Sequence, residues 1–265
     1  MLRRPAGVVG AALVLVVVVT GIIGPWVAPH DPFSVDNPSL AAPSWDYPMG
    51  TDALGRDILS GVLHGLRTSL LVAASVAAIV VIVGLTVGMA AGYRAGRLDD
   101  VLMRGTEFAQ VLPRFFLAIV VIALFGPGLV NLVVVLGLTS WPLLARVVRA
   151  EVLSLREREF VEAAKADGAS AARIVGRELL PNVVPSAIVV VGLLVAQVML
   201  IEASLGFLGL GDPNVVSLGY LASQGQDFLR AAWWVAVFPG AAILAAVLGL
   251  NLLGDAVTDA LGRRR

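Results

Sequence analysis

Six long apolar runs divide this chain, and they restrict its fold more than any other feature of the sequence. Each run holds about 20 mostly apolar residues, the length that an α-helix needs to cross a hydrocarbon core about 30 Å thick. Apolar residues make up 58% of the 265 residues and charged residues only 14%, whereas a soluble domain carries about 25% charged residues. The sequence therefore predicts an all-α polytopic membrane protein with six transmembrane helices near these segments: Val8–Val27, Ser69–Gly92, Arg104–Phe125, Leu129–Val148, Val183–Ala203 and Ala231–Leu253.

The basic residues orient the chain, because cytoplasmic segments of membrane proteins carry an excess of lysine and arginine. With the N-terminus inside, 15 basic residues fall on the cytoplasmic side and three on the outer side, namely Arg56, Arg67 and Arg230. Both termini are therefore expected to be cytoplasmic. Since two arginines precede the first apolar run, that run is either a signal peptide or an uncleaved span. Its length and the lack of a small-x-small cleavage site favour a span.

We expect three parts along the chain. Residues 1–28 form the N-terminal tail and the first membrane helix, residues 29–66 an extracytoplasmic segment, and residues 67–265 a membrane core with five further helices and an internal loop at 150–181. Five prolines between residues 28 and 66 rule out one continuous helix there and predict turns and short pieces. A second, glycine-rich outer segment from Ser204 to about Leu229 is expected to be a re-entrant or surface element.

Glycines recur every four residues in the second apolar run, at Gly84, Gly88 and Gly92. Such a stripe of small residues lets another helix approach closely. It predicts tight helix packing, either within this chain or at an interface with a second subunit.

The charged, alanine-rich stretch before the fifth apolar run must lie outside the bilayer. Its alanines predict a short helix over Phe160–Asp167 that ends at Gly168 in a left-handed conformation. Ser170 can cap a second helix, Ala171–Leu179, which Pro181 is expected to stop. Together the two helices form a compact cytoplasmic knob. From these residues alone, the knob is either a docking element for a partner or a solvated hairpin without one.

Several kinds of function lack the residues that they require. A P-loop needs Gly-Lys followed by Ser or Thr, and the only lysine, Lys165, follows Ala164, so this chain cannot bind ATP through that motif. The chain has no cysteine, which excludes disulfides, thiolate metal sites and cysteine nucleophiles. His30 and His64 are expected to be surface or structural residues, and no metal site is predicted. A secondary transporter should show paired charges at mid-membrane and often an internal repeat, and neither pattern is present.

Glu202 lies near the outer end of the fifth apolar run. A carboxylate in a membrane span is costly and is by default a functional candidate. Glu202 either faces a transport pathway or bonds the glycine-rich element that follows it.

The knob resembles the "EAA" loop of permease subunits of bacterial ATP-binding cassette (ABC) importers. The signature of that loop is Glu-Ala-Ala, three residues, Gly, nine residues, Ile, one residue, Leu-Pro. Glu178 stands at the isoleucine position, and the remaining positions match in register: Glu162, Ala163, Ala164, Gly168, Leu180 and Pro181. The resemblance implies a type I ABC importer-like fold in which these six residues contact an ATPase.

Further segments resemble the dipeptide/oligopeptide permease family, in particular its second, C-type permease subunit. They cover nearly the whole chain: residues 47–52, 55–57 and 66–70, then Glu202 with Leu205 and residues 207–211, and finally residues 251–255 with Asp259. The resemblance implies that Glu202 and Phe207 belong to the pathway or to an external gate.

The same resemblance implies a non-catalytic subunit that forms half of a pathway for dipeptides or short oligopeptides across the bacterial cytoplasmic (inner) membrane. The implied partners are a homologous second permease subunit, two ABC domains that bind ATP and Mg, an extracytoplasmic substrate-binding protein and membrane lipid. No nucleic acid is implied, and no cofactor in this chain. Nickel, haem, glutathione or another small solute stay open as cargoes of the same transporter class, and a secondary transporter is a remoter alternative.

Overall fold

The computed structural model describes residues 5–262, so the arginines counted at the two chain ends (Arg3, Arg4 and residues 263–265) lie outside the described residues. Within the described part, the chain is nearly all helical, with one isolated β-bridge between Thr51 and Asp57. In chain order the elements are α1 (Pro5–Val27), α2 (Ile58–Arg94), α3 (Gly96–Val111), α4 (Arg114–Phe125), α5 (Leu129–Leu155), α6 (Glu159–Ala166), α7 (Ala171–Arg173), the π-helical turn η1 (Ile174–Leu179), α8 (Leu180–Phe207), α9 (Leu218–Gln224), the 3₁₀ turn η2 (Gln226–Phe228) and α10 (Trp234–Gly262).

Five helices of the described chain are long and apolar enough to cross a membrane: α1, α2, α5, the run from α7 through α8, and α10. A sixth crossing exists if α3 and α4 are taken together as one broken span. The predicted all-helical architecture is confirmed, and the span expected over Arg104–Phe125 is interrupted at Pro113, where a proline inside a span predicts a kink. Pro113 biases the residue before it away from helical geometry, so Leu112 is extended (φ −72°, ψ 119°) and the two helices meet at 74°.

The expected stop at Pro181 is also wrong. The chain runs on as one helix from Ala171 to Phe207. A π turn interrupts the usual bonding just before the proline, and the Leu180 N–H donates to the carbonyl of Val175. Pro181 directly follows this π turn, so it falls where the i→i−4 bonding is already interrupted and its missing N–H is tolerated.

The region without helix is shorter than the expected outer segment, because α2 already begins at Ile58. Asp57 caps this helix, and its carboxylate accepts from the backbone N–H of Ser60 at 2.9 Å. Turns and bends therefore occupy residues 28–57, which we call the proline-rich lobe.

The glycine stripe of α2 packs inside this chain, which confirms the first of the two interpretations. A Cβ added at Gly84 would stand 2.9 Å from the Leu144 side chain, and one at Gly92 would stand 2.7 Å from Val152 Cβ. Both neighbours belong to α5. The absence of side chains along the stripe thus lets α2 and α5 lie in close contact, and a similar close contact joins α1 to α10 at Gly10.

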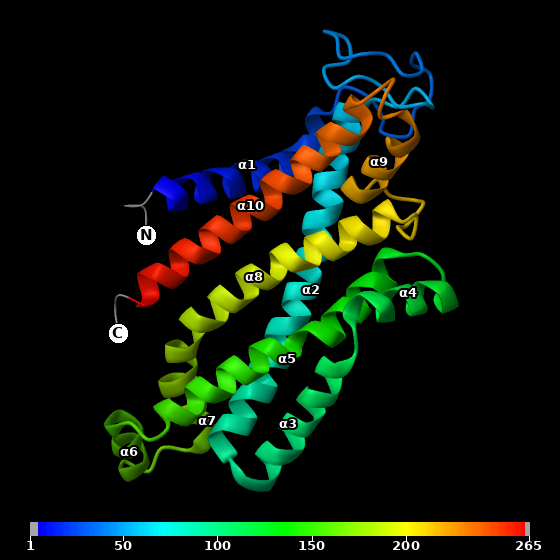
Figure 1. Cartoon of the computed structure of the whole chain (residues 1–265). Coiled ribbons are helices and arrows are strands. Elements are labelled where there is room, and N and C mark those ends of the chain that lie inside the picture. The colour runs from blue at the N-terminus through cyan, green and yellow to red at the C-terminus, as the bar shows by residue number, and fades with distance from the viewer. Residues whose placement is uncertain (1–4, 263–265) are drawn as a thin grey trace.

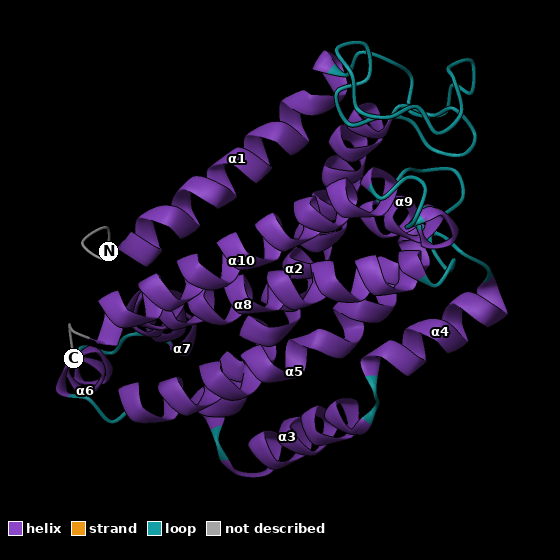
Figure 2. Cartoon of the chain, turned by 45° about the horizontal axis from the view of Figure 1, so that its top comes forward, coloured by secondary structure: helices purple, strands orange, loops and turns teal. Residues whose placement is uncertain are grey.

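The two ends of the helix bundle carry different structures. The proline-rich lobe lies at one end, next to α9, and α6 lies at the opposite end (Figure 1). The first turn of α1 and the last turn of α10 lie at the same end as α6 (Figure 2). The bundle therefore separates two candidate sites, one at each of its ends.

Candidate functional site

Local interactions build the knob at the α6 end. The chain leaves α6 through Gly168, which has a left-handed φ of +76°. The Gly168 N–H donates to the Lys165 carbonyl and the Ala169 N–H donates to the Ala164 carbonyl, both at 3.0 Å. This pair of bonds is a Schellman motif, which needs a residue that adopts positive φ without strain. The predicted helix and its left-handed glycine are confirmed, and the signature glycine has a physical reason.

A small apolar base holds the knob together. Val161 of α6 is fully buried against Ile174 and Leu179 of η1, which are also buried. Ala164 and Leu180 are half-buried and pack against this base. Two of the six signature residues therefore serve the internal packing of the knob.

The other four signature residues lie on the surface: Glu162, Ala163, Gly168 and Pro181. A Cβ added at Gly168 would meet no atom within 4 Å, so this side of the turn is open. Glu162 forms an ion pair with Lys165 at 2.7 Å, and the two side chains are 61% and 44% exposed. Because so exposed a pair is worth little in water, the Glu162 carboxylate can exchange Lys165 for a cation on another protein.

Two further contacts hold together the helices from which the knob extends, and sequence reasoning missed both. On α5, Arg149 makes a bidentate ion pair with Asp99 of α3, with 2.6 Å between Nη2 and Oδ2. Arg156, in the short link between α5 and α6, donates to the Gly92 carbonyl of α2 at 3.3 Å. The two contacts thus tie α5, which leads into the knob, to α3 and α2. In the sequence, Arg149 and Arg156 were visible only as members of the cytoplasmic charge excess.

At the other end of the bundle, Glu202 is buried and hydrogen-bonded. Its residue is 3% exposed, and the Ser69 hydroxyl of α2 donates to its Oε2 at 2.7 Å. The Ser217 hydroxyl, at the start of α9, adds a second interaction with the carboxylate. A buried carboxylate needs such partners because its desolvation is otherwise costly. The hydrogen bond to Ser69 ties α8 to α2, and the contact with Ser217 is the one that reaches the glycine-rich segment.

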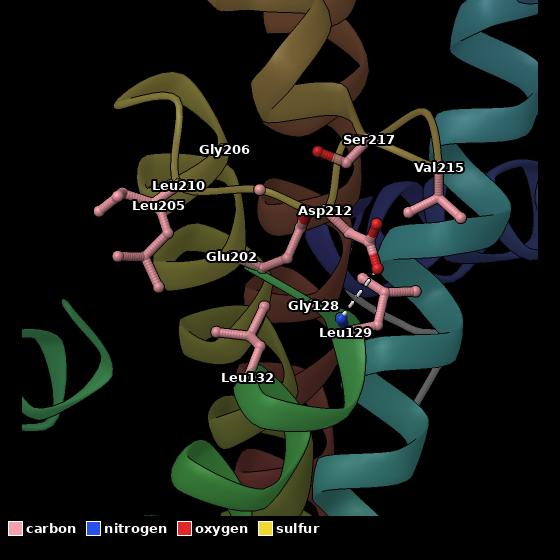
Figure 3. A pocket seen from close by; sticks show the side chains of 11 residues that line it. Gly128, Leu129, Leu132, Glu202, Leu205, Gly206, Leu210, Asp212, Val215 and Ser217 are labelled. Atoms are coloured by element: carbon pink, nitrogen blue, oxygen red, sulfur yellow. Dashed lines mark hydrogen bonds between the residues drawn. The ribbon is translucent and has the colours of Figure 1, made fainter. Parts of the chain in front are cut away.

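Asp212 shares a small cavity with Glu202, and sequence reasoning did not single it out. Figure 3 shows both carboxylates in this pocket, above the first turn of α5. Asp212 Oδ2 accepts from the Leu129 N–H at 3.3 Å, and Oδ1 accepts from the Asn214 N–H at 2.9 Å. Asp212 therefore caps α5 from a loop 83 residues away. The cavity has a volume of about 10 Å³, close to the smallest that holds one water.

Phe207 lies elsewhere. It is half-exposed and lines an open, mostly apolar groove between α8, α9 and α10, together with Leu200, Ala203 and Ile243. Glu202 does not line this groove. The structure therefore separates the two residues that the sequence grouped as one gate.

The backbone of one histidine and the ring of the other both meet Ser60, and the His30 N–H donates to Ser60 Oγ at 3.1 Å. His30 Nδ1 lies 3.6 Å from the Asp57 carboxylate in the proline-rich lobe. His64 Nδ1 lies 2.9 Å from the Ser60 carbonyl, one turn earlier in α2. Among residues 5–262, no three side chains of His, Cys, Asp or Glu gather closely enough to hold a metal ion.

Two family models match the chain. Residues 84–265 match the model described as binding-protein-dependent transport system inner membrane component, and residues 1–43 match the N-terminal transmembrane domain of oligopeptide transport permease C. The first match covers more than half of the chain and includes the whole knob.

Named relatives are similar over almost their full length. The chain is 38% identical to the di/tripeptide transport system permease protein DppC of Pseudomonas aeruginosa (strain UCBPP-PA14), over 95% of this chain and 86% of the relative. It is 39% identical to the dipeptide transport system permease protein DppC of Escherichia coli (strain K12), over 98% of this chain and 89% of the relative. Among solved structures, a chain of the MetNI methionine ABC transporter in an inward-facing conformation has the same fold, with a TM-score of 0.63 at 20% identity, over 77% of this chain and 97% of that one.

Proposed function

The chain belongs to the family of binding-protein-dependent transport system inner membrane components, and we propose that it is one permease subunit of an ABC importer for dipeptides and short oligopeptides. The observation that carries this proposal is the knob, which exposes four residues of the coupling signature on a locally rigid support at one end of a membrane bundle. The relatives named for dipeptide and di/tripeptide transport support the cargo class.

The active transporter contains other subunits. A second, homologous permease supplies the other half of the pathway, two ABC domains bind ATP and Mg, and an extracytoplasmic binding protein delivers the peptide. This chain has no lysine in P-loop context, so hydrolysis takes place on the partners and this subunit is not itself an enzyme.

The α6 end faces the cytoplasm in this proposal. The described basic residues support that orientation, because Arg146, Arg149, Arg156, Arg158 and Lys165 all belong to the α6 end of α5 or to the knob. With α6 inside, both chain ends are cytoplasmic and the proline-rich lobe lies outside the cell membrane.

Coupling runs from the ATPases through the knob into the membrane helices. Closure of the two ATPases around ATP displaces α6, whose Schellman turn and buried base move with it as one body. The short link at Arg156 and the Arg149–Asp99 ion pair carry this displacement into α5, α3 and α2. Rocking of this bundle against the second permease then changes the pathway from inward-facing to outward-facing.

The outer gate uses Glu202 and Phe207 in different ways. Glu202 positions the glycine-rich loop through Ser69 and Ser217, so that the loop keeps its shape while the helices move. Phe207 lines the open groove and is the candidate for contact with cargo or with the second permease.

Transport by the complete complex in proteoliposomes, with Glu162→Lys or Gly168→Val in this subunit, tests the coupling assignment. Both variants should insert and assemble with the second permease but lose most peptide uptake, because the changed positions lie on the exposed side of the knob. Stimulation of ATP hydrolysis by the loaded binding protein should fall in parallel.

Two matched controls separate coupling from folding. Glu159→Lys makes the same charge change in the first turn of the same helix, at an exposed position outside the signature. Gly126→Val makes the same substitution at another glycine of positive φ (+87°) with no atom within 4 Å, at the far end of α4, and so carries the same kind of backbone strain. Both controls should transport normally. Normal uptake by the Glu162 and Gly168 variants would remove the docking role, and uptake of nickel, haem or glutathione instead of dipeptides by the wild type would replace the cargo.

A further inference from the structure

We propose that Trp45 and Asp46, at the tip of the proline-rich lobe, anchor the extracytoplasmic substrate-binding protein, whose contacting surface offers an apolar recess beside basic side chains. This inference rests on the proposed function, which requires such a partner but does not say where it docks.

A tight turn with a fixed base presents the tip. The Ser44 N–H donates to the Tyr47 carbonyl at 2.9 Å, and the Tyr47 N–H donates to Ser44 Oγ at 3.1 Å. The two residues between them therefore project outward. Tyr47 is itself held, because its hydroxyl donates to Asn37 Oδ1 at 3.1 Å and its ring stacks on His30 with 5.5 Å between centroids.

The rest of the lobe is clamped to the bundle. Thr51 is fully buried, and its carbonyl accepts from Trp234 Nε1, at the start of α10, at 3.2 Å. Arg56 Nη1 donates to the Tyr220 hydroxyl of α9 at 3.2 Å. Segments of this length without helix or strand are uncommon in compact domains and are usually functional. Because the lobe is ordered before any partner arrives, binding at its tip carries a low entropic cost.

The surface of the tip combines an aromatic side chain with negative charge. Trp45 is fully exposed, and tryptophan is among the residues that most often dominate the energy of protein interfaces. The lobe contains five aspartates, and three of them are exposed: Asp31, Asp36 and Asp46. Its single arginine is turned inward, toward the ring of Phe33 and the Tyr220 hydroxyl. The complementary surface is therefore basic with an apolar recess.

The position of the lobe favours a partner that approaches from outside the membrane. It lies beyond the ends of the membrane helices and opposite α6 (Figure 1). The ATPases dock at the α6 end in the proposed function, and the second permease packs along the helices. The binding protein is the remaining subunit that approaches this end of the bundle.

Binding of the purified, dipeptide-loaded binding protein to the complete transporter in lipid nanodiscs tests the anchor. Trp45→Ala should raise the Kd by about 30-fold or more, the usual size of a hot-spot effect. Asp46→Lys should raise the Kd at low salt, with an effect that shrinks toward 0.5 M salt because the charges are screened. Trp26→Ala is the control, since Trp26 is also largely exposed but belongs to α1, outside the lobe. Its Kd should equal that of the wild type.

A labelling experiment reports the same contact without relying on affinity. The chain has no cysteine, so Trp45→Cys creates a single thiol that a membrane-impermeant maleimide should modify in the free complex and not in the complex with bound protein. Wild-type Kd values for Trp45→Ala and Asp46→Lys, with a thiol that stays reactive, would overturn the docking site while leaving the importer intact. Quenching by brominated lipids of a fluorophore attached to the Trp45→Cys thiol would also overturn the docking site, because it would show that the tip contacts lipid. If the wild-type complex binds no such protein and its ATPase is not stimulated, the proposed function fails, and the docking site with it.

Discussion

Replacing Gly88 by alanine probes the close contact between α2 and α5, on which the position of the knob depends. An added Cβ would stand 2.6 Å from the Ala145 carbonyl oxygen and 2.7 Å from Val148 Cβ. Neither atom can rotate away, because one is backbone and the other is bonded directly to it. Ordinary contact begins at 3.4 Å, so α2 and α5 would have to separate by about 0.8 Å, and a packed interior resists such a shift.

Two opposing effects decide how much the substitution changes the free energy of unfolding. Alanine is favoured over glycine inside a helix by about 1 kcal/mol, whereas overpacking a tight contact costs about 1–3 kcal/mol. Gly192→Ala in α8 is the matched control, because a Cβ there would meet no atom within 4 Å and only the favourable effect remains. The Gly88 variant should therefore be less stable than the Gly192 variant by about 1–3 kcal/mol.

Thermal unfolding of the purified protein, followed by tryptophan fluorescence in one detergent and at one heating rate, measures this difference. A chain of this size loses about 2–4 °C in Tm per kcal/mol, so Gly88→Ala should unfold several degrees below Gly192→Ala. Coupled ATPase activity should fall with it, since α5 leads directly into the knob. Equal melting temperatures for the two variants would refute the close-contact reasoning.

Two further predictions concern buried and partly buried polar contacts. A double-mutant cycle with Arg149→Ala and Asp99→Ala, followed by thermal or denaturant unfolding, should give a coupling free energy between about 0.5 and 3 kcal/mol. The reason is that the bidentate ion pair bridges α3 and α5. If the effects of the two single substitutions simply add, the ion pair contributes nothing to stability. Glu202→Gln should keep near-wild-type stability, since its amide oxygen still accepts from Ser69, whereas Glu202→Leu should lose about 1–3 kcal/mol by leaving the hydroxyl without its acceptor. If the Leu variant is as stable as the Gln variant, the hydrogen bond between α8 and α2 does not contribute to stability.

Features that depend on neighbouring residues were predictable from the sequence. The helix over residues 160–167 and its left-handed glycine follow from local propensity and from the Schellman bonds, which join residues at most five positions apart. The cap at Ser170, which accepts from the Arg173 N–H at 3.4 Å, is of the same kind. The stop expected at Pro181 was wrong because local rules assume i→i−4 bonding, and the π turn before this proline changes that register.

Of the site around Glu202, the sequence predicted the carboxylate but not its partners. The cost of a carboxylate in a membrane span singled out Glu202 from its position alone. Its partner Ser69 is 133 residues away, and Asp212 reaches an α5 terminus that is 83 residues away. No periodicity or motif relates such residues, so their meeting follows only from the way in which the helices pack.

The sequence by itself determined the membrane class, the approximate crossings, the bias of charge toward one side and the exposed coupling signature. These properties are set by composition over windows of about 20 residues and by short-range hydrogen bonds, so they are present before the helices pack. Only the tertiary structure decided that α5 is the helix that meets the glycine stripe of α2 and that the third crossing bends by 74°. It also decided that Glu202 and Phe207 occupy separate sites and that the proline-rich segment is clamped to the bundle as a lobe. These features depend on distances between helices far apart in the chain, and steric fit and buried hydrogen bonds set those distances when the bundle assembles.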